Sequence, residues 1–537
     1  MPPASHITTT PADSPSDTLE RHQSGVFCSS TAFPTLNDLQ AVTSTKTETP
    51  ASFAADSLAI GMLVVLGMTI IQRSLGFLRS IWFCRLMDDA LVGQWAMAFD
   101  FITMATPVML FGMPGSLPRY VETYRQQGHL GSLVRRLLIA TLACAGAFLV
   151  GLMVAPDWFG WLIFLESDNN TLTYSVAAGV LAIIAFNFVH QLVSSLRQVR
   201  VASMMQFVQS VAFTLIGVGW LINGGGLAGL ILSFAIASLI AILPGGWTLA
   251  QGWRGLPRSE SRFDATSMWR RLLPYAVALW VMNLLSNLFE MSDRYMILHF
   301  TSGGEQMGQA AVGQYHSGRI FPVLLMSLAS MIAGVLMPYL AADWESGRRE
   351  AVVDRIRKVL AALSVVFTLG AAGTLWIAPW LFANLLQNRY ADGLALMPMA
   401  FVFYIWASLV MIGQDYLWVA ERGKLVGIAI AVGLTLNLIL NALLLPRLGL
   451  QGAVIATLCA HGTVMIGIWI AMAWCGFKFD LTMISISILP ASLMLGPAVA
   501  VLSVSTVIFI SPQIKIWLGE GMSLIAAKFS GPATQLS

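Results

Sequence analysis

The residues best placed to do chemistry are charged side chains inside long apolar segments. In the apolar run 58–84, the stretch QRSLGFLRS places Arg73 and Arg79 six positions apart, with Gly76 between them. A charged group at bilayer depth is costly and therefore usually faces a partner or a water-filled cavity. Arginine stays charged at any working pH, and its planar fork suits phosphate oxygens. These two residues therefore favour an anion-binding cavity.

Further charged residues interrupt the other apolar runs. Four of the charged residues inside these runs are expected to lie at a similar depth in the membrane. With a rise of about 1.5 Å per residue, these four lie roughly 8–14 Å from the outer ends of their runs. They are Arg79, Asp100, Glu290 and Arg319. We expect them to form one layer of a shared cavity, with Asp100 and Glu290 as charge partners or coupling groups. In the alternative, Arg73 and Arg79 pair with these two carboxylates and only hold helices together.

Other polar residues carry more modest expectations. Asp293, Arg294 and Asp415 lie near the ends of their runs, so we expect interfacial anchors or a local pair. Asn437 and Asn441 are four positions apart and share one helix face, where they could bind sugar hydroxyls or join helices. The five cysteines show no Cys-x-x-Cys pairing, so we expect neither a disulfide framework nor a metal site.

The composition excludes a soluble enzyme. Of the 537 residues, 57% are hydrophobic and 11% are charged, whereas soluble domains have about 25% charged residues. The mean hydropathy of +0.73 agrees with this conclusion. The sequence contains no Walker A loop, no HExxH or GxSxG motif and no TVGYG-like filter. We therefore predict a polytopic secondary transporter or flippase, with no cofactor and no nucleic-acid partner.

Thirteen apolar runs are long enough to cross a hydrocarbon core about 30 Å thick. They are 58–84, 91–114, 137–158, 172–193, 201–222, 227–250, 272–298, 312–340, 359–385, 395–419, 425–445, 452–474 and 483–510, the last interrupted by two prolines. Loops after the even-numbered runs hold 19 Lys and Arg, and loops after the odd-numbered runs hold three. This asymmetry predicts that the even-numbered loops and the N-terminus lie in the cytoplasm.

The chain also contains a weak internal repeat. GLAG at 226–229 and GLQG at 449–452 each begin an apolar run of the same predicted orientation, so the repeat is parallel. We predict an all-α membrane protein with two six-helix bundles and 12–14 transmembrane helices. The predicted regions are a disordered cytoplasmic tail (1–55), an N-terminal half (58–250), a cytoplasmic linker (251–271), a C-terminal half (272–474), and an additional helix with a tail (475–537).

Several stretches carry a family resemblance. They are RSLGFLR (73–79), RYVETYRQQG (119–128), DRYMILHF (293–300), VGQYHSGRIFPVLL (312–325), LMPYLAADWESG (336–347) and LNLILNALLLPRLGLQGAVIAT (436–457). In this order and spacing they resemble the multidrug/oligosaccharidyl-lipid/polysaccharide exporter superfamily, in particular its polysaccharide-flippase branch.

The resemblance implies a function and a binding site. In the related lipid II flippases, similar arginines are assigned to the pyrophosphate of the substrate, and the matching positions here are Arg73, Arg79 and Arg319. These flippases also carry an acidic residue in their second membrane span, and Asp100 is only a candidate for the matching position here. The implied protein moves undecaprenyl-pyrophosphate-linked oligosaccharide across the bacterial cytoplasmic membrane for surface polysaccharide biosynthesis. Its implied partners are membrane lipids, a polysaccharide polymerase and glycosyltransferases.

Three other functions remain open at this point. A cation or drug antiporter of the same superfamily would use Glu290 as its coupling carboxylate, but its first segment often carries Asp where this chain has Arg. A membrane scaffold for glycan assembly would tolerate Gln at Arg73, Arg79 and Arg319. A membrane-embedded glycosyltransferase would need a catalytic loop outside the membrane, and the outer loops here are short.

Overall fold

The computed structural model is helical throughout the residues that it describes. These residues are 58–110, 113–166, 170–253, 255, 263–301, 303–517 and 519, and all belong to the unit Ala51–Ser537. No strand occurs among them, so the predicted all-α class is confirmed for this part of the chain. The predicted tail 1–55, residues 254 and 256–262 of the predicted linker, and residues 518 and 520–537 of the predicted C-terminal region lie outside the described residues.

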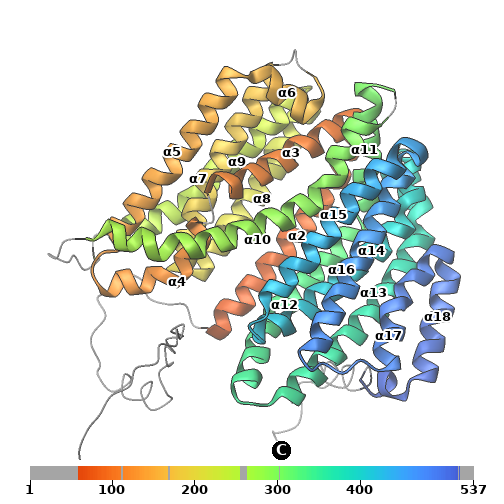
Figure 1. Ribbon diagram of the computed structural model, residues 1–537. Coiled ribbons are helices and arrows are strands. Elements are labelled where there is room, and N and C mark those ends of the chain that lie inside the picture. The colour runs from red at the N-terminus through yellow and green to blue at the C-terminus, as the bar shows by residue number, and fades with distance from the viewer. Residues whose placement is uncertain are drawn as a thin grey trace, which may run out of the picture. The chain divides into compact units, whose positions relative to one another are not determined.

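The helices form two sets in chain order (Figure 1). The first set is α2 (Leu58–Leu86), α3 (Asp89–Leu110), α4 (Met113–Gln126), α5 (Leu130–Val154), α6 (Pro156–Phe164), α7 (Asn170–Ser195), α8 (Val199–Ile222) and α9 (Gly226–Trp253). The second set is α10 (Ala265–Phe300), α11 (Glu305–Arg319), α12 (Pro322–Glu345), α13 (Arg349–Leu385), α14 (Ala391–Val419), α15 (Gly423–Leu448), α16 (Leu450–Trp474), α17 (Leu481–Ile488), the 3-10 helix η2 (Leu489–Leu495) and α18 (Pro497–Ile510).

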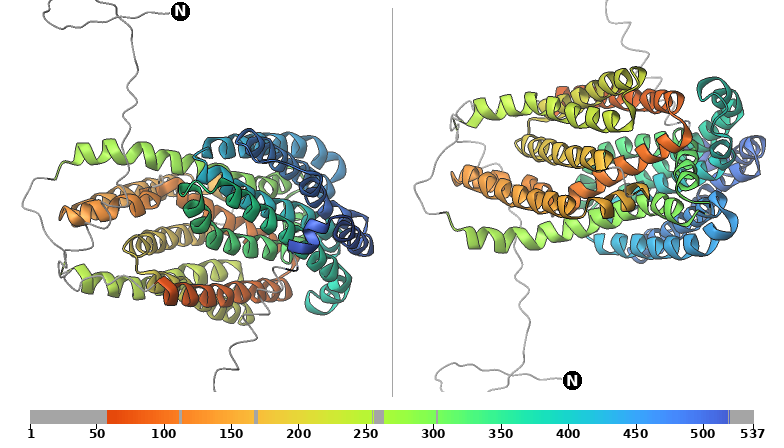
Figure 2. Two further views of the ribbon diagram at one scale, coloured as in Figure 1. Left: turned by 90° about the horizontal axis from the view of Figure 1, so that it is seen from below. Right: turned by 90° about the horizontal axis from the view of Figure 1, so that it is seen from above.

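The two sets make two lobes. In the first lobe α8 packs on α2 and α9, and α7 packs on α9; in the second, α15 packs on α16, and α14 packs on α12 and α16. Both views in Figure 2 place the yellow helices of the first lobe and the blue helices of the second on opposite sides.

Ten of the described helices are long and apolar enough to cross a membrane by length and composition. They are α5, α7, α8, α9, α10, α12, α13, α14, α15 and α16. The predicted runs 58–84 and 91–114 form α2 and α3, which are not among the ten. The predicted run 312–340 is divided between α11 and α12, which meet immediately before Pro322. Proline lacks an amide hydrogen and restricts the residue before it, so a break is expected there.

The lobes meet closely along α3 and α11, at the end that the charge asymmetry assigns to the outside. A Cβ atom on Gly93 would lie 1.8 Å from the carbonyl oxygen of Gln309, and one on Gly313 would lie 1.9 Å from that of Asp89. Only glycine permits such a close approach of two backbones. Gln314 Nε2 also donates to Asp89 Oδ2 at 3.1 Å. These contacts form a closed seam between the lobes.

The run 483–510 does not form the single span that the sequence predicted. Instead, α17 and η2 are followed by α18 in a hairpin that turns at Gly496, whose φ of 112° favours glycine. The hydroxyl oxygens of Thr482 and Ser511 lie 3.3 Å apart, so the two ends of the hairpin return to the same level. Figure 1 shows α17 and α18 side by side. The two prolines of the run lie at the starts of η2 and α18.

Candidate functional site

A cavity of about 320 Å³ lies between the two lobes and is rich in cationic side chains. We call its four arginines the arginine cluster. They are Arg73 and Arg79 from α2, Arg294 from α10 and Arg319 from the last turn of α11. Glu290 and His316 also line this cavity. The structure thus brings the three arginines that the resemblance indicated into one cavity, together with Glu290.

The two α2 arginines of the cluster, Arg73 and Arg79, have no carboxylate partner among the described residues. Arg73 is exposed and lines the cavity. The Arg79 guanidinium lies 4.4 Å from the centre of the Phe213 ring, and its Nη1 donates to Thr214 Oγ1 at 3.4 Å. The cation–π contact and this long hydrogen bond hold the Arg79 side chain in place without neutralising it. Both charges therefore remain available to an anion.

The two carboxylates of the predicted layer pair with other arginines. Asp100 forms an ion pair with Arg294, and Glu290 Oε1 lies 3.8 Å from Arg319 Nη2. The alternative in which Arg73 and Arg79 pair with these carboxylates is therefore wrong in this structure. Four arginines against the three nearby carboxylates of Asp100, Glu290 and Asp293 leave the neighbourhood of the cavity with an excess of positive charge.

Two tyrosines hold the Arg319 side chain in place, and the sequence alone did not indicate them. Arg319 Nε donates to the Tyr404 hydroxyl at 2.7 Å, and its guanidinium lies 4.9 Å from the ring centre of Tyr315. Arg319 Nη1 and Arg294 Nε are buried without a hydrogen-bond partner among the described residues. A buried donor without a partner is costly and points to a missing acceptor. The arginine cluster therefore presents unused donors as well as unused charge.

Asp293 lies next to the cavity but is fully hydrogen-bonded within the protein. It is 2% exposed and accepts four hydrogen bonds of 2.5–2.9 Å. We call Asp293 and its four donors the Asp293 cluster. The donors are the Tyr315 hydroxyl of α11, the Asn437 and Asn441 side-chain amides of α15, and the Thr457 hydroxyl of α16. This cluster joins four helices.

The expectation that Asp293 and Arg294 are interfacial anchors or a local pair is wrong. Asp293 binds the donors of three neighbouring helices, and Arg294 binds Asp100 of the other lobe. Asp415 is also buried, at 8% exposure, with its Oδ2 lacking a hydrogen-bond partner among the described residues. Other helices cover the ends of the helices that carry these residues. A position near the end of an apolar run therefore did not mean that the side chain is exposed.

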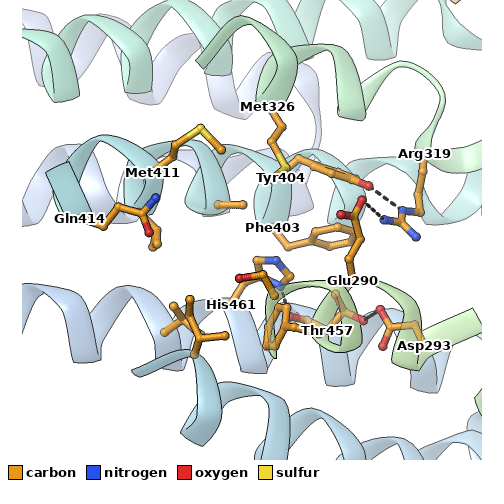
Figure 3. A pocket seen from close by; sticks show the side chains of 16 residues that line it. Glu290, Asp293, Arg319, Met326, Phe403, Tyr404, Met411, Gln414, Thr457 and His461 are labelled. Atoms are coloured by element: carbon orange, nitrogen blue, oxygen red, sulfur yellow. Dashed lines mark hydrogen bonds and ion pairs between the residues drawn. The ribbon is translucent and has the colours of Figure 1, made fainter. Parts of the chain in front are cut away.

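A second cavity, of about 250 Å³, lies inside the second lobe (Figure 3). It shares Glu290, Arg319 and Tyr404 with the cavity between the lobes. In Figure 3 the Glu290 carboxylate points toward Arg319, and Thr457 points toward Asp293. The Glu290–Arg319 pair therefore lies at the boundary between the two cavities.

Comparison with known proteins places the chain in a family. Residues 58–343 match the family model described as polysaccharide biosynthesis protein. The chain belongs to this family. The match includes every residue of the arginine cluster, as well as Asp100 and Glu290.

Two uncharacterized membrane proteins have related sequences. The uncharacterized membrane protein YabM of Bacillus subtilis (strain 168) is 24% identical over 75% of this chain and 78% of its own. The uncharacterized membrane protein MJ1068 of Methanocaldococcus jannaschii is 22% identical over 71% and 76%. These relatives support a multi-pass membrane protein.

Two solved structures share the fold at low sequence identity. The lipid II flippase MurJ in an inward closed conformation has a TM-score of 0.63 and 12% identity, over 86% of this chain and all of its own. An inward-facing multidrug resistance MATE transporter of the MOP superfamily has a TM-score of 0.57 and 14% identity, over 78% and 99%. The family match confirms the predicted polysaccharide biosynthesis family, and these structures confirm the predicted two-lobed helical fold.

Proposed function

We propose that this polysaccharide biosynthesis protein is a flippase for polyprenyl-pyrophosphate-linked oligosaccharide. The observation that carries the proposal is the arginine cluster, in which Arg73 and Arg79 line the cavity between the lobes without a carboxylate partner. A pyrophosphate would supply both the counter-charge and the acceptors for the unused donors of Arg294 and Arg319. A cationic drug would meet an excess of like charge there.

The proposed mechanism is alternating access. The closed seam along α3 and α11 shuts one end of the interface, so the substrate enters the cavity from the other end. The arginine cluster neutralises the pyrophosphate and thereby lowers the cost of bringing it to bilayer depth. The lobes then rock apart along the seam and release the pyrophosphate and glycan on the outer side. The break before Pro322 is a suitable bending point, because α12 follows Arg319 directly.

The proposed orientation rests on the charge asymmetry of the loops, and the proposed setting rests on the family. The protein spans the bacterial cytoplasmic membrane with its N-terminus in the cytoplasm. Its substrate is an undecaprenyl-pyrophosphate-linked glycan made by glycosyltransferases on the inner face. A polysaccharide polymerase uses the translocated unit on the outer face. Asp100 and Glu290 serve as charge partners that keep Arg294 and Arg319 in place.

The test is mass spectrometry of lipid extracts from cells that lack the protein. We expect the complete lipid-linked oligosaccharide to accumulate, and the wild-type gene to relieve the accumulation. The double variant Arg73→Gln/Arg79→Gln should reach the membrane in normal amount but should not relieve it. Arg422→Gln, at an exposed turn away from the cavity, is the matched control.

Two results would contradict the proposal. Full relief by the double variant would show that the arginine cluster does not bind the pyrophosphate. No accumulation in the deletion strain, together with raised sensitivity to cationic dyes, would favour the antiporter and make Glu290 the residue to test.

A further inference from the structure

An apolar groove lies on the outside of the second lobe, between α12 and α13. Its volume is about 420 Å³, and all of its lining side chains are aliphatic, thioether or aromatic. They are Leu328, Met331, Ile332, Val335, Leu336, Tyr339 and Phe367. Leu328, Ile332 and Val335 remain 36–48% exposed, so the groove is open along its length.

The groove has the length and the end group of a lipid-binding site in one leaflet. From Leu328 to Tyr339 the α12 axis rises about 16 Å, close to one half of a hydrocarbon core about 30 Å thick. Tyr339 lies at the end of the groove nearest the loop that the charge asymmetry assigns to the cytoplasm. Tyrosine is typical of this interfacial depth.

Two arginines stand at the same end of the groove. The Arg355 guanidinium lies 5.7 Å from the centre of the Tyr339 ring, and its Nη2 lies 2.8 Å from Asp343 Oδ2. Arg348 Nη2 lies 2.7 Å from the other oxygen of the same carboxylate. Two cations that share one carboxylate leave a positive charge. Their side chains are 43% and 63% exposed, so this charge is accessible from the headgroup region.

We propose that this groove binds an anionic phospholipid of the cytoplasmic leaflet. One acyl chain fills the groove along α12, and the phosphate lies against Arg355 and Arg348. The proposal goes beyond the flippase function, since this lipid is a bound component of the protein and is not transported.

The competing occupant is the polyprenyl chain of the transported substrate. The groove shares Leu328 and Met331 with an apolar cavity beside Arg73. A long apolar chain bound at the arginine cluster could therefore reach the groove from inside. The cationic end at Arg355 favours the phospholipid, because a polyprenyl tail carries no charge at that end.

The test is native mass spectrometry of the purified full chain, titrated with phosphatidylglycerol or phosphatidylcholine. We expect wild type to prefer phosphatidylglycerol. Arg355→Gln should weaken phosphatidylglycerol binding about fivefold, the effect of one interfacial cation, and should weaken phosphatidylcholine binding less, because its trimethylammonium partly neutralises the phosphate. Val335→Trp, which fills the groove, should weaken binding of both lipids. The matched controls are Arg422→Gln and Val432→Trp, the latter on an exposed face of α15.

Each possible failure has its own signature. Wild-type lipid binding by Val335→Trp would overturn the proposal, and so would wild-type selectivity of Arg355→Gln. Displacement of phosphatidylglycerol by a polyprenyl phosphate in wild type but not in Val335→Trp would assign the groove to the substrate tail instead. The assay needs no transport, so its result is separate from that of the flippase test.

Discussion

The arginine cluster and the Asp293 cluster are adjacent, yet their hydrogen bonding is opposite. Asp293 uses both carboxylate oxygens within the protein and is 2% exposed. Arg73 and Arg79 meet no carboxylate among the described residues, and Arg319 keeps an unused donor. A charged residue inside a membrane helix therefore does not by itself mark a binding site. The arginine cluster keeps cations without a carboxylate partner and is the one available to a ligand, whereas the Asp293 carboxylate accepts four hydrogen bonds and holds helices together.

The largest expected effect comes from removing the Asp293 carboxylate, at the centre of its cluster. Asp293→Ala leaves four buried donors on three helices without their acceptor. Hydrogen bonds between membrane helices average about 0.6 kcal/mol each, so the free energy of unfolding should fall by about 2–3 kcal/mol. The thermal midpoint of the detergent-purified protein measures this loss. Asp293→Asn keeps one acceptor and should lose less; an unchanged midpoint in Asp293→Ala would mean that the cluster is not structural.

The second effect separates binding from stability. Arg79→Gln removes a cation that has no ion-pair partner, so the thermal midpoint should stay within error of wild type. A hydrogen bond to a charged group contributes about 1.5 kcal/mol at the lower end of its range. Affinity for a water-soluble polyprenyl-pyrophosphate analogue should therefore fall about tenfold. Equilibrium binding by microscale thermophoresis measures it, and a fall in stability without a fall in affinity would reverse the roles of the two clusters.

A smaller effect is expected at the boundary between the clusters. Tyr404→Phe removes the hydroxyl that accepts from Arg319 Nε at 2.7 Å. The ring remains, so packing is preserved and the loss should be about 1 kcal/mol. Because Arg319 lines both cavities, we expect part of this loss in stability and part in affinity. A loss confined to stability would place Arg319 with the structural cluster.

The smallest effect tests the edge of the Asp293 cluster. Ser292 Oγ donates to Asn437 Oδ1 at 2.9 Å and does not reach Asp293. Ser292→Ala should therefore lower the free energy of unfolding by about 0.6 kcal/mol and leave analogue affinity unchanged. A loss as large as that of Asp293→Ala, in the same thermal assay, would mean that Asn437 rather than the carboxylate organises the cluster.

The sequence predicted the helices well where an apolar run ended in charge or glycine. The run 483–510 contains a turn signal, the Gly496-Pro497 pair, but apolar residues continue on both sides of it, so hydrophobicity alone predicted one span. Likewise, the break before Pro322 lies inside one apolar run. Local backbone geometry decided both cases, and the average hydrophobicity of a segment does not report it.

The sequence also predicted that Arg79, Glu290 and Arg319 line one cavity, as they do, but not which of the charges pair. Depth depends on counting along one helix, whereas pairing depends on how two helices are rotated. Arg294 was therefore assigned to an interface, although it reaches Asp100 of the other lobe. The expectation for Asp293 failed because the end of α10 is covered, as the contact of His299 Nε2 with the Leu162 carbonyl oxygen at 3.3 Å shows. The prediction that Asn437 and Asn441 share one helix face was correct. Their common partner, Asp293, could not be predicted from the sequence.

The hairpin of α17, η2 and α18 also determines where reporters can be attached. Because Thr482 and Ser511 lie side by side, the chain leaves this hairpin at the level where it entered. A fluorescent protein inserted after Ser511 would therefore report from the same compartment as one inserted in the turn before Asp480. A protease added to one face of sealed vesicles would cut engineered sites at both positions or at neither.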